Sequence, residues 1–405
     1  MVIQDNQQVI IIVLLIINKK HNNMKFIVHG STLARSLNSI MGLISKNNTI
    51  PIVENLLFEL NDKTLSITAS DLETVANVSI ELQDADSIGI SKVCVPAKEF
   101  YSLASQLTSR PLTMFVNEDY SVDIATDNGG KYNFKGIDPE DYPKMIEIED
   151  KNEFTIQSST LVNGINKTLF ATSNDEFRPQ MAGVLCEFSP KGLTFVGTDS
   201  HKLVRFRNTM YATDDVKSFI LPKKTLNMIA KILSSINEDF EVRVENNMSN
   251  IAFYFENYHF ACRLIDGKYP QYDSAIPMDN PNKLIVDKNS LLESVKRISI
   301  FTNPTTNQIR FEVTDREIVI QAEDVDAQNK AQERISCSYE GEQMTIGLNA
   351  KYLTEIINNV ETENICFEMS RPDRPCIVLP YDEETKDEQK QETLLMLLMP
   401  VILMS

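Results

Sequence analysis

The chain has 405 residues, of which 42% are hydrophobic and 24% charged, and this length suits two or three globular domains. The composition excludes a wholly disordered chain, a collagen and a polytopic membrane protein. With 57 acidic and 39 basic residues the net charge is -18, which argues against a simple basic nucleic-acid-binding protein. Four His are too few for a His-rich metal site, and six Cys show no C-x-x-C spacing. We therefore expect a cytosolic protein with reduced thiols and neither metal nor cofactor.

The first 23 residues differ from the rest of the chain. Residues 9–17 form an unbroken aliphatic run, which is shorter than the roughly 20 residues that a membrane-spanning helix needs. Asp5 lies where a signal peptide would be basic, and Asn18-Lys19-Lys20-His21 follows the run. We expect an extension that is not part of the fold, with Met24 as the working start. A weak signal or anchor and a short extra strand are the alternatives.

The first periodic segment after Met24 has the spacing of an amphipathic helix. Leu33, Leu37 and Ile40 fall on one face of the segment 31–46, and the Ser at its start is a plausible N-cap. Next, LSITAS (65–70) alternates apolar and polar residues, which predicts a half-buried strand.

A second helix is predicted over 96–107, directly after the dipeptide Val95-Pro96. Proline suits the first turn of a helix because its fixed φ is already helical. SVDIAT (121–126) then alternates like the earlier strand. This part of the chain therefore combines two helices with several strands.

The same order of elements occurs three times, at a spacing of about 126 residues. The repeat is visible in six groups of matching strings: LLFEL, VLCEF and IRFEV; LSITASD, LTFVGTD and IVIQAED; their closing acids Asp71, Asp199 and Asp324; VPAKEF, LPKKTL and LNAKYL; KFIVHGSTL, EFTIQSSTL and KLIVDKNSL; and IDPEDYP with IDGKYP. The period far exceeds that of a solenoid, so each copy is a full domain with its own core. Helices are accordingly predicted over 158–173 and 222–236 in the second copy, and over 288–301 and 349–360 in the third. The class is α+β, with two helices and antiparallel sheets in each copy.

Charge is segregated between the predicted helices and the rest of the chain. The six helices carry eleven basic residues and three acidic ones (Glu99, Glu293 and Glu355), although the whole chain is acidic. Basic residues are common on any solvated helix face, which is the alternative explanation. A positive lining within a negative exterior accounts better for the missing acids, and it indicates an anionic polymer passing the helices. Edge strands of each copy can pair with the next copy, and head-to-tail association of two chains would close a ring.

Three motifs occur in an order that resembles a known family: TDSHKLV (198–204), DGKYPQY (266–272) and LLMPVIL (397–403). With the threefold repeat, they make the chain similar to the bacterial DNA polymerase III beta subunit family, the sliding clamps, from Met24 to Leu403. The resemblance implies a non-catalytic, head-to-tail homodimer of three-domain subunits that forms a ring around duplex DNA. It also implies binding of the replicative polymerase, the clamp loader and other peptide-motif proteins. The expected boundaries are an extension at 1–23 and clamp domains at 24–149, 150–281 and 282–405.

The resemblance also implies three sets of site residues. A partner-peptide pocket between the second and third domains would comprise Met181, Thr198, Asp199, Ser200, His201, Lys202, Leu203, Pro270, Ala275, Leu397, Leu398, Met399 and Pro400. The DNA-facing residues would be Arg35, Lys46, Lys98, Lys167, Arg178, Lys223, Lys224, Lys231, Lys296, Arg297 and Lys351. The subunit interface would include Lys131, Tyr132 and Phe134 on one side and Ile300 and Phe301 on the other. Plain core positions are the alternative for these apolar residues.

Some positions depart from the family pattern. Lys202 stands where Arg is frequent, and Gln180 stands where a gating aromatic residue often lies. Asn47 replaces a basic loop residue, although Lys46 adjoins it. Met404 and Ser405 extend past the usual end and could change the rim of the groove.

Two other classes of protein deserve comparison. Thr198-Asp199-Ser200-His201 contains the residue types of a hydrolase triad, but triad members come from separate segments, and the chain has no G-x-S-x-G elbow. It also has no P-loop motif for ATP, so a clamp would need a separate loader. A periplasmic or surface β-repeat protein would fit the acidic charge and the apolar amino terminus, but it would not explain the cationic helices.

Overall fold

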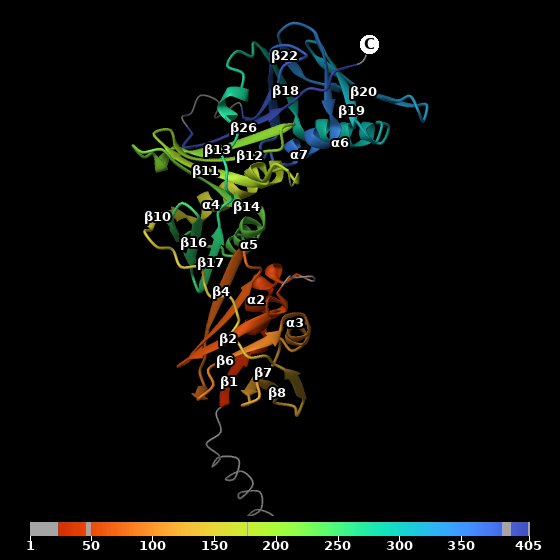
Figure 1. The fold of residues 1–405 in the computed structure, drawn as a ribbon. Helices are drawn as coiled ribbons and strands as arrows, with labels where there is room; N and C mark the ends of the chain where they lie inside the picture. Colours follow the sequence, from red (N-terminus) through yellow and green to blue (C-terminus); the bar gives the residue numbers. More distant parts are fainter. Residues whose placement is uncertain (1–22, 46–49, 176, 383–389, 404–405) are drawn as a thin grey trace, which may run out of the picture. The chain divides into compact units, whose positions relative to one another are not determined.

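The computed structural model describes residues 23–45, 50–175, 177–382 and 390–403. The expectations for residues 1–22, Lys46, Asn47 and Met404-Ser405 lie outside these ranges. The chain divides into two compact units, Met1–Gln157 with Ser235–Arg263 and Ser158–Ser234 with Leu264–Ser405. The division passes through the second copy, whose strands are shared between the units (Figure 1).

In its described residues, unit 1 contains two antiparallel sheets and one pair of α-helices. The five-stranded sheet has the order β5 (Ala85–Ile88), β1 (Asn23–His29), β7 (Pro111–Val116), β8 (Ser121–Thr126) and β9 (Lys131–Lys135). The eight-stranded sheet has the order β10 (Asn152–Gln157), β15 (Glu241–Asn246), β16 (Asn250–Phe255), β17 (Tyr258–Arg263), β4 (Thr74–Glu81), β3 (Thr64–Ser70), β2 (Asn55–Asn61) and β6 (Lys92–Pro96). Helices α2 (Gly30–Ile40) and α3 (Ala97–Gln106) pack against each other.

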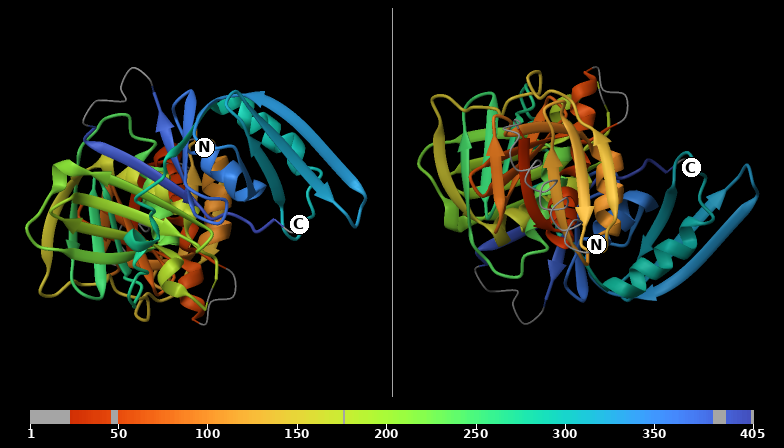
Figure 2. Two further views of the ribbon diagram at one scale, coloured as in Figure 1. Left: turned by 90° about the horizontal axis from the view of Figure 1, so that it is seen from above. Right: turned by 90° about the horizontal axis from the view of Figure 1, so that it is seen from below.

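Unit 2 has the same kinds of element. Its nine-stranded sheet has the order β14 (Lys217–Pro222), β11 (Gly183–Ser189), β12 (Gly192–Thr198), β13 (Lys202–Asn208), β26 (Glu392–Leu398), β25 (Cys376–Tyr381), β24 (Asn364–Met369), β18 (Asn282–Asp287) and β22 (Ser338–Glu340). Its four-stranded sheet has the order β21 (Asn329–Ser336), β20 (Glu317–Asp324), β19 (Gln308–Val313) and β23 (Met344–Asn349). The helices form two packed pairs, α4 (Ser158–Thr168) with α5 (Lys223–Leu233) and α6 (Lys288–Ser299) with α7 (Ala350–Asn358). Figure 2 shows α6 along one face of the four-stranded sheet.

Edge strands of neighbouring copies pair as expected. In unit 1, β17 of the second copy runs antiparallel to β4 of the first, with Phe260 opposite Ala76. In unit 2, β13 of the second copy runs antiparallel to β26 of the third, with Val204 opposite Met396. Each pairing removes two sheet edges, which would otherwise expose unpaired backbone groups.

Helices α4 and α6 start at the predicted residues, and the starts of α2, α3, α5 and α7 differ from the prediction by one residue. The cap of α2 is His29, whose ring accepts a hydrogen bond from the Ser31 N–H, and the cap of α6 is Asp287, which accepts from Ser290. The expectation of a Ser cap for the first helix is therefore wrong, because α2 and α6 each begin directly after a strand and the last strand residue becomes the cap. Pro96 and Pro222 likewise lie at the N-cap position, one residue before the first turn.

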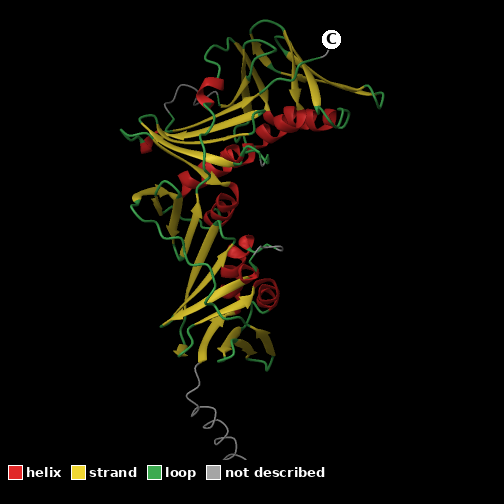
Figure 3. Cartoon of the chain, in the orientation of Figure 1, coloured by secondary structure: helices red, strands yellow, loops and turns green. Residues whose placement is uncertain are grey.

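The nine-stranded sheet has its α-helices on one face (Figure 3). Val204, Met396 and Leu398 point to that face and belong to one buried core with side chains of α6 and α7. Leu203 and Leu397 point to the other face, since successive strand residues alternate. There they form a second buried cluster with Leu185, Val196, Tyr269 and Tyr272.

Candidate functional site

The central feature of the candidate site is the turn Thr198–Lys202 between β12 and β13. Asp199 Oδ1 accepts hydrogen bonds from the N–H groups of His201 and Lys202, both at 2.9 Å. Thr198 Oγ1 accepts from the Ser200 N–H at 3.2 Å and donates to the Lys202 carbonyl at 2.8 Å. Ser200 has a φ of 77°, an uncommon conformation that these bonds hold.

The repeated acids share this role in the fold. In the first copy, Asp71 Oδ1 accepts from the N–H groups of Glu73 and Thr74, and Leu72 has the same φ of 77°. In the third copy, Asp324 Oδ1 accepts from two following N–H groups at 3.1 and 3.3 Å. An aspartate is suited to this turn because its carboxylate can accept from backbone two and three residues ahead.

The carboxyl-terminal segment borders the turn. Lys202 and Leu203 of β13 pair with Leu398 and Leu397 of β26. The next residue, Met399, donates its N–H to the His201 carbonyl at 2.9 Å. The second copy's turn and the third copy's last strand thus form one surface.

The predicted pocket residues divide into a buried floor and an exposed rim. Met181, Leu203 and Leu397 are 4%, 4% and 2% exposed, and the Ser200 hydroxyl lies 3.7 Å from the Met181 sulfur. The exposed members are Ser200, His201, Pro270, Ala275 and Met399. Pro400 is half-buried. This is an apolar floor beneath a polar and apolar rim.

The structure corrects the role of Leu398. Its side chain is fully buried in the core formed with α6 and α7, on the opposite face of the sheet from Leu397. It therefore supports the site from behind and does not line its surface.

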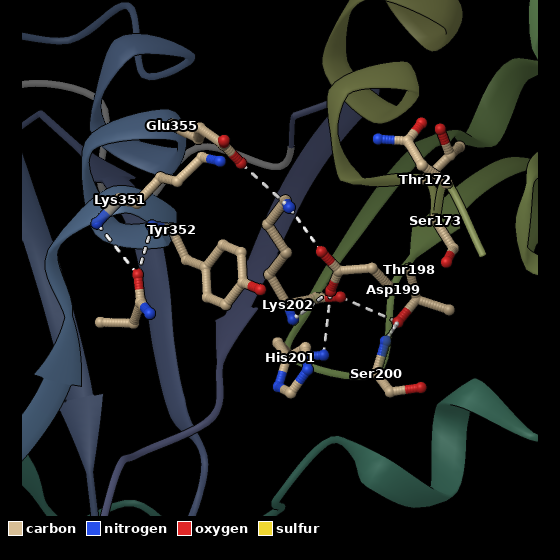
Figure 4. Close-up of polar contacts among 12 residues, drawn as sticks. Thr172, Ser173, Thr198, Asp199, Ser200, His201, Lys202, Lys351, Tyr352 and Glu355 are labelled. Carbon is tan, nitrogen blue, oxygen red and sulfur yellow. Dashed lines mark hydrogen bonds and ion pairs between the residues drawn. The ribbon is translucent and has the colours of Figure 1, made fainter. Parts of the chain in front are cut away.

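Lys202 is buried at the junction between the second and third copies (Figure 4). Its Nζ lies 2.6 Å from Asp199 Oδ2 and 3.0 Å from Glu355 Oε2 on α7. It also lies 4.6 Å from the centre of the Tyr352 ring, on which the His201 ring stacks. Burial alone would lower the pKa of Lys202, but the hydrogen bonds to Asp199 and Glu355 outweigh it and raise that pKa. Lys202 therefore remains a cation.

Sequence reasoning missed Tyr352 and Glu355. The sequence feature that could have indicated Glu355 is its charge, because it is one of only three acids in the predicted helices. An acid kept in a cationic helix indicates a specific basic partner, and that partner is Lys202.

The predicted DNA-facing cations fall into two groups. Lys167 pairs with Glu361, Arg178 with Asp175 at 2.8 Å, and Arg297 with Glu333 at 2.8 Å. The count of helix charges therefore overstates the positive field, because Glu361 and Glu333, which pair with the helix residues Lys167 and Arg297, lie outside the predicted helices. Arg178 also donates to the Ser200 hydroxyl at 2.9 Å, which places it beside the candidate pocket.

The other group keeps its charge uncompensated by a close acid. Within the described ranges, we find no ion pair for the following residues: Arg35 on α2, Lys98 on α3, Lys231 on α5, Lys296 on α6 and Lys351 on α7. Lys98 is half-buried and the other four are exposed. Lys223, which donates to Asn174 at 3.2 Å, and Lys224 are not counted in this group.

The predicted subunit-contact residues lie on or beside outer strands. Lys131, Tyr132 and Phe134 belong to β9, the edge of the five-stranded sheet. The Phe134 ring lies 5.6 Å from that of Phe100, so part of this side chain packs into its own domain. Ile300 and Phe301, at the end of α6, are 76% and 37% exposed.

Three αβ copies that share sheets, with a buried apolar cluster and an exposed rim at one junction, define the class of three-domain clamp proteins. In the part of the chain that the structure describes, each helix is too short or too polar to cross a bilayer. Family models of the DNA polymerase III beta subunit match residues 24–146 (N-terminal domain), 155–271 (central domain) and 273–396 (C-terminal domain). The chain belongs to the DNA polymerase III beta subunit family. It is a DNA sliding clamp, a non-catalytic processivity factor, and not an enzyme.

Relatives and solved structures agree with this membership. The beta sliding clamp of Proteus mirabilis is 25% identical over 342 residues, covering 84% of this chain and 92% of that protein. That of Pseudomonas aeruginosa is 25% identical over 362 residues, covering 89% and 97%. The P. aeruginosa clamp bound to griselimycin superimposes with a TM-score of 0.86 at 24% identity, covering 94% of this chain and 100% of that one. The Bacillus subtilis clamp gives 0.85 at 24% identity, covering 95% and 100%.

Proposed function

We propose that two copies of this chain associate head to tail into a ring around duplex DNA, and that the ring tethers the replicative polymerase. The observation that carries the proposal is the distribution of uncompensated cations. Arg35, Lys98, Lys231, Lys296 and Lys351 lie on five different helices. Dispersed single charges attract phosphate without gripping it at one point, which suits movement along DNA without sequence readout.

Ring closure would use the outer sheet edges. Strand β9 ends the five-stranded sheet and β21 ends the four-stranded one. An edge strand carries unpaired N–H and C=O groups that can extend a sheet into a second chain. We place the subunit contact between these edges, with Ile300 and Phe301 as its apolar part.

The surface around the Thr198–Lys202 turn would bind the partners. We propose that the apolar anchor of a peptide from the polymerase, the clamp loader or a repair protein packs over Met181, Leu203 and Leu397. Ser200, His201 and Met399 would form the rim. Apolar anchors that fill small, well-packed sites typically dominate the energy of such contacts.

The remaining assignments follow from the same function. We propose clamp domains at 24–149, 150–281 and 282–405, and a location in the cytoplasm, where replication proceeds.

Charge reversal tests the lining. We expect the triple variant Lys231→Glu, Lys296→Glu and Lys351→Glu to be loaded on and retained by circular DNA at least about tenfold less than wild type, because each lost phosphate contact lowers affinity. A triple reversal of Lys63, Lys144 and Lys217, which are exposed and lie outside the helices and the proposed subunit contact, is the matched control. Equal solution mass and thermal midpoint would show that the fold and dimer are intact. Wild-type retention by the helix variant would contradict the lining.

A further inference from the structure

One ion pair connects the candidate peptide site to a helix of the next copy. Lys202 belongs to β13 of the second copy, whereas Glu355 belongs to α7 of the third. The Lys202 side chain is only 4% exposed, and its Nζ contacts both Asp199 and Glu355. The three residues form what we term the Lys202 cluster.

Asp199 performs two tasks in this cluster. Its Oδ1 holds the N–H groups of His201 and Lys202, and its Oδ2 holds the Lys202 ammonium. A shift of the ammonium would therefore move the carboxylate that shapes the turn. The same turn includes His201, whose carbonyl accepts a hydrogen bond from the Met399 N–H.

On the side of α7, the Lys202 cluster is bordered by further contacts to the turn. Glu355 lies one helical turn from Tyr352, and these two α7 residues contact the same ammonium. The His201 ring stacks on Tyr352 with centroids 5.4 Å apart and an interplanar angle of 15°. Figure 4 shows Lys202 between Asp199 and Glu355, with the Tyr352 ring alongside.

Removing one partner of a buried charge leaves the other uncompensated. Without the Glu355 carboxylate, the Lys202 ammonium would keep Asp199 but lose its attachment to α7. The turn would keep its internal hydrogen bonds, but its position against α7 would no longer be held by charge.

We propose that Glu355 is a positioning residue of the peptide-binding site: through Lys202 it holds the Thr198–Lys202 turn against α7 and so sets the separation of the rim residues. This inference rests on the proposed function. Glu355 itself touches no peptide in this account, because its role is exerted through Lys202.

The test compares two ion pairs that join the same two copies. Glu355→Gln removes the pair at the turn, and Glu361→Gln removes the pair with Lys167, which does not touch the turn. Labelled peptides tiled across the replicative polymerase of the same organism are titrated with the full-length clamp, and the tightest binder is kept as the probe. We expect Glu355→Gln to weaken its binding about tenfold, within the usual range of coupling between sites, and Glu361→Gln to weaken it less than about twofold. Glu355→Asp, which keeps the charge, should recover most of the affinity.

Thermal midpoints and retention on circular DNA are measured for every variant. Equal loss of peptide affinity in Glu355→Gln and Glu361→Gln would overturn the proposal. It would mean that weakening the contact between the two copies at either place is enough to weaken peptide binding, without a specific role for the turn. Unchanged affinity in Glu355→Gln would overturn it while leaving the peptide site in place. A wild-type clamp that binds none of the peptides would remove the site itself, and with it the role of Glu355.

Discussion

At the residue scale, the repeated aspartates show which part of the site can be read from sequence. Asp71, Asp199 and Asp324 recur because each turn needs a side-chain acceptor for backbone N–H groups. That need is local, so it leaves a signal in the sequence. The pairing of Lys202 with Glu355 joins positions far apart in the chain, and no local pattern reveals it.

Leu397 and Leu398 show a second limit. In LLMLL (394–398) every position is apolar, so the alternation that normally separates the two faces of a strand is missing. Only the pairing of β26 with β13 shows that Leu397 faces the candidate site and Leu398 the core.

His259 predicts a pH dependence of stability. Burial lowers its pKa to about 4, and its buried Nε2 has no hydrogen-bond partner among the described residues. Since the folded-state pKa lies below the unfolded value near 6.5, the stabilising contribution is complete above about pH 6.5 and is lost as the pH falls toward 4. We expect the thermal midpoint to fall over this window, and His259→Gln to show a flatter profile. An identical profile in the variant would contradict the assignment.

At the element scale, periodicity and repetition are sufficient to predict the six α-helices of the described residues and the strands β3 and β8. The cap of the first helix was misplaced because α2, like α6, follows its strand without a loop, so a strand residue such as His29 or Asp287 becomes the cap. The pairing of strands between copies followed from the need to cover edges. The path of the carboxyl-terminal segment beside β23 could not be predicted from the sequence. It depends on a close backbone approach at a single glycine, and no local pattern marks that glycine.

That glycine is Gly347 on β23. The Val401 N–H donates to its carbonyl at 2.8 Å, and a Cβ at this position would lie 2.4 Å from the Val401 oxygen. Gly347→Ala should therefore displace the segment that follows Met399, destabilise the chain by about 1–3 kcal/mol and weaken peptide binding several-fold. Thr345→Ala, at an exposed position of the same strand, should do neither. Thermal unfolding and peptide titration measure the two effects, and wild-type peptide affinity in Gly347→Ala would show that the segment is not part of the site.

At the scale of the whole molecule, charge segregation was the strongest functional signal. The segregation survives in part, because nearby acids pair with Lys167, Arg178 and Arg297. The cations that remain are spread over the helices, which is the arrangement expected for a lining that retains DNA by enclosing it. Tight retention must then come from topology, since dispersed charges alone give weak, salt-sensitive binding.

The most direct measurement is therefore retention after loading on nicked circular DNA, followed by linearisation with a restriction enzyme. The clamp should stay on the circle through a high-salt wash and leave once the DNA has free ends. Equal retention on circular and linear DNA, or loss from the circle in high salt, would mean that the protein grips the duplex or binds it only by charge, and would contradict an enclosing ring.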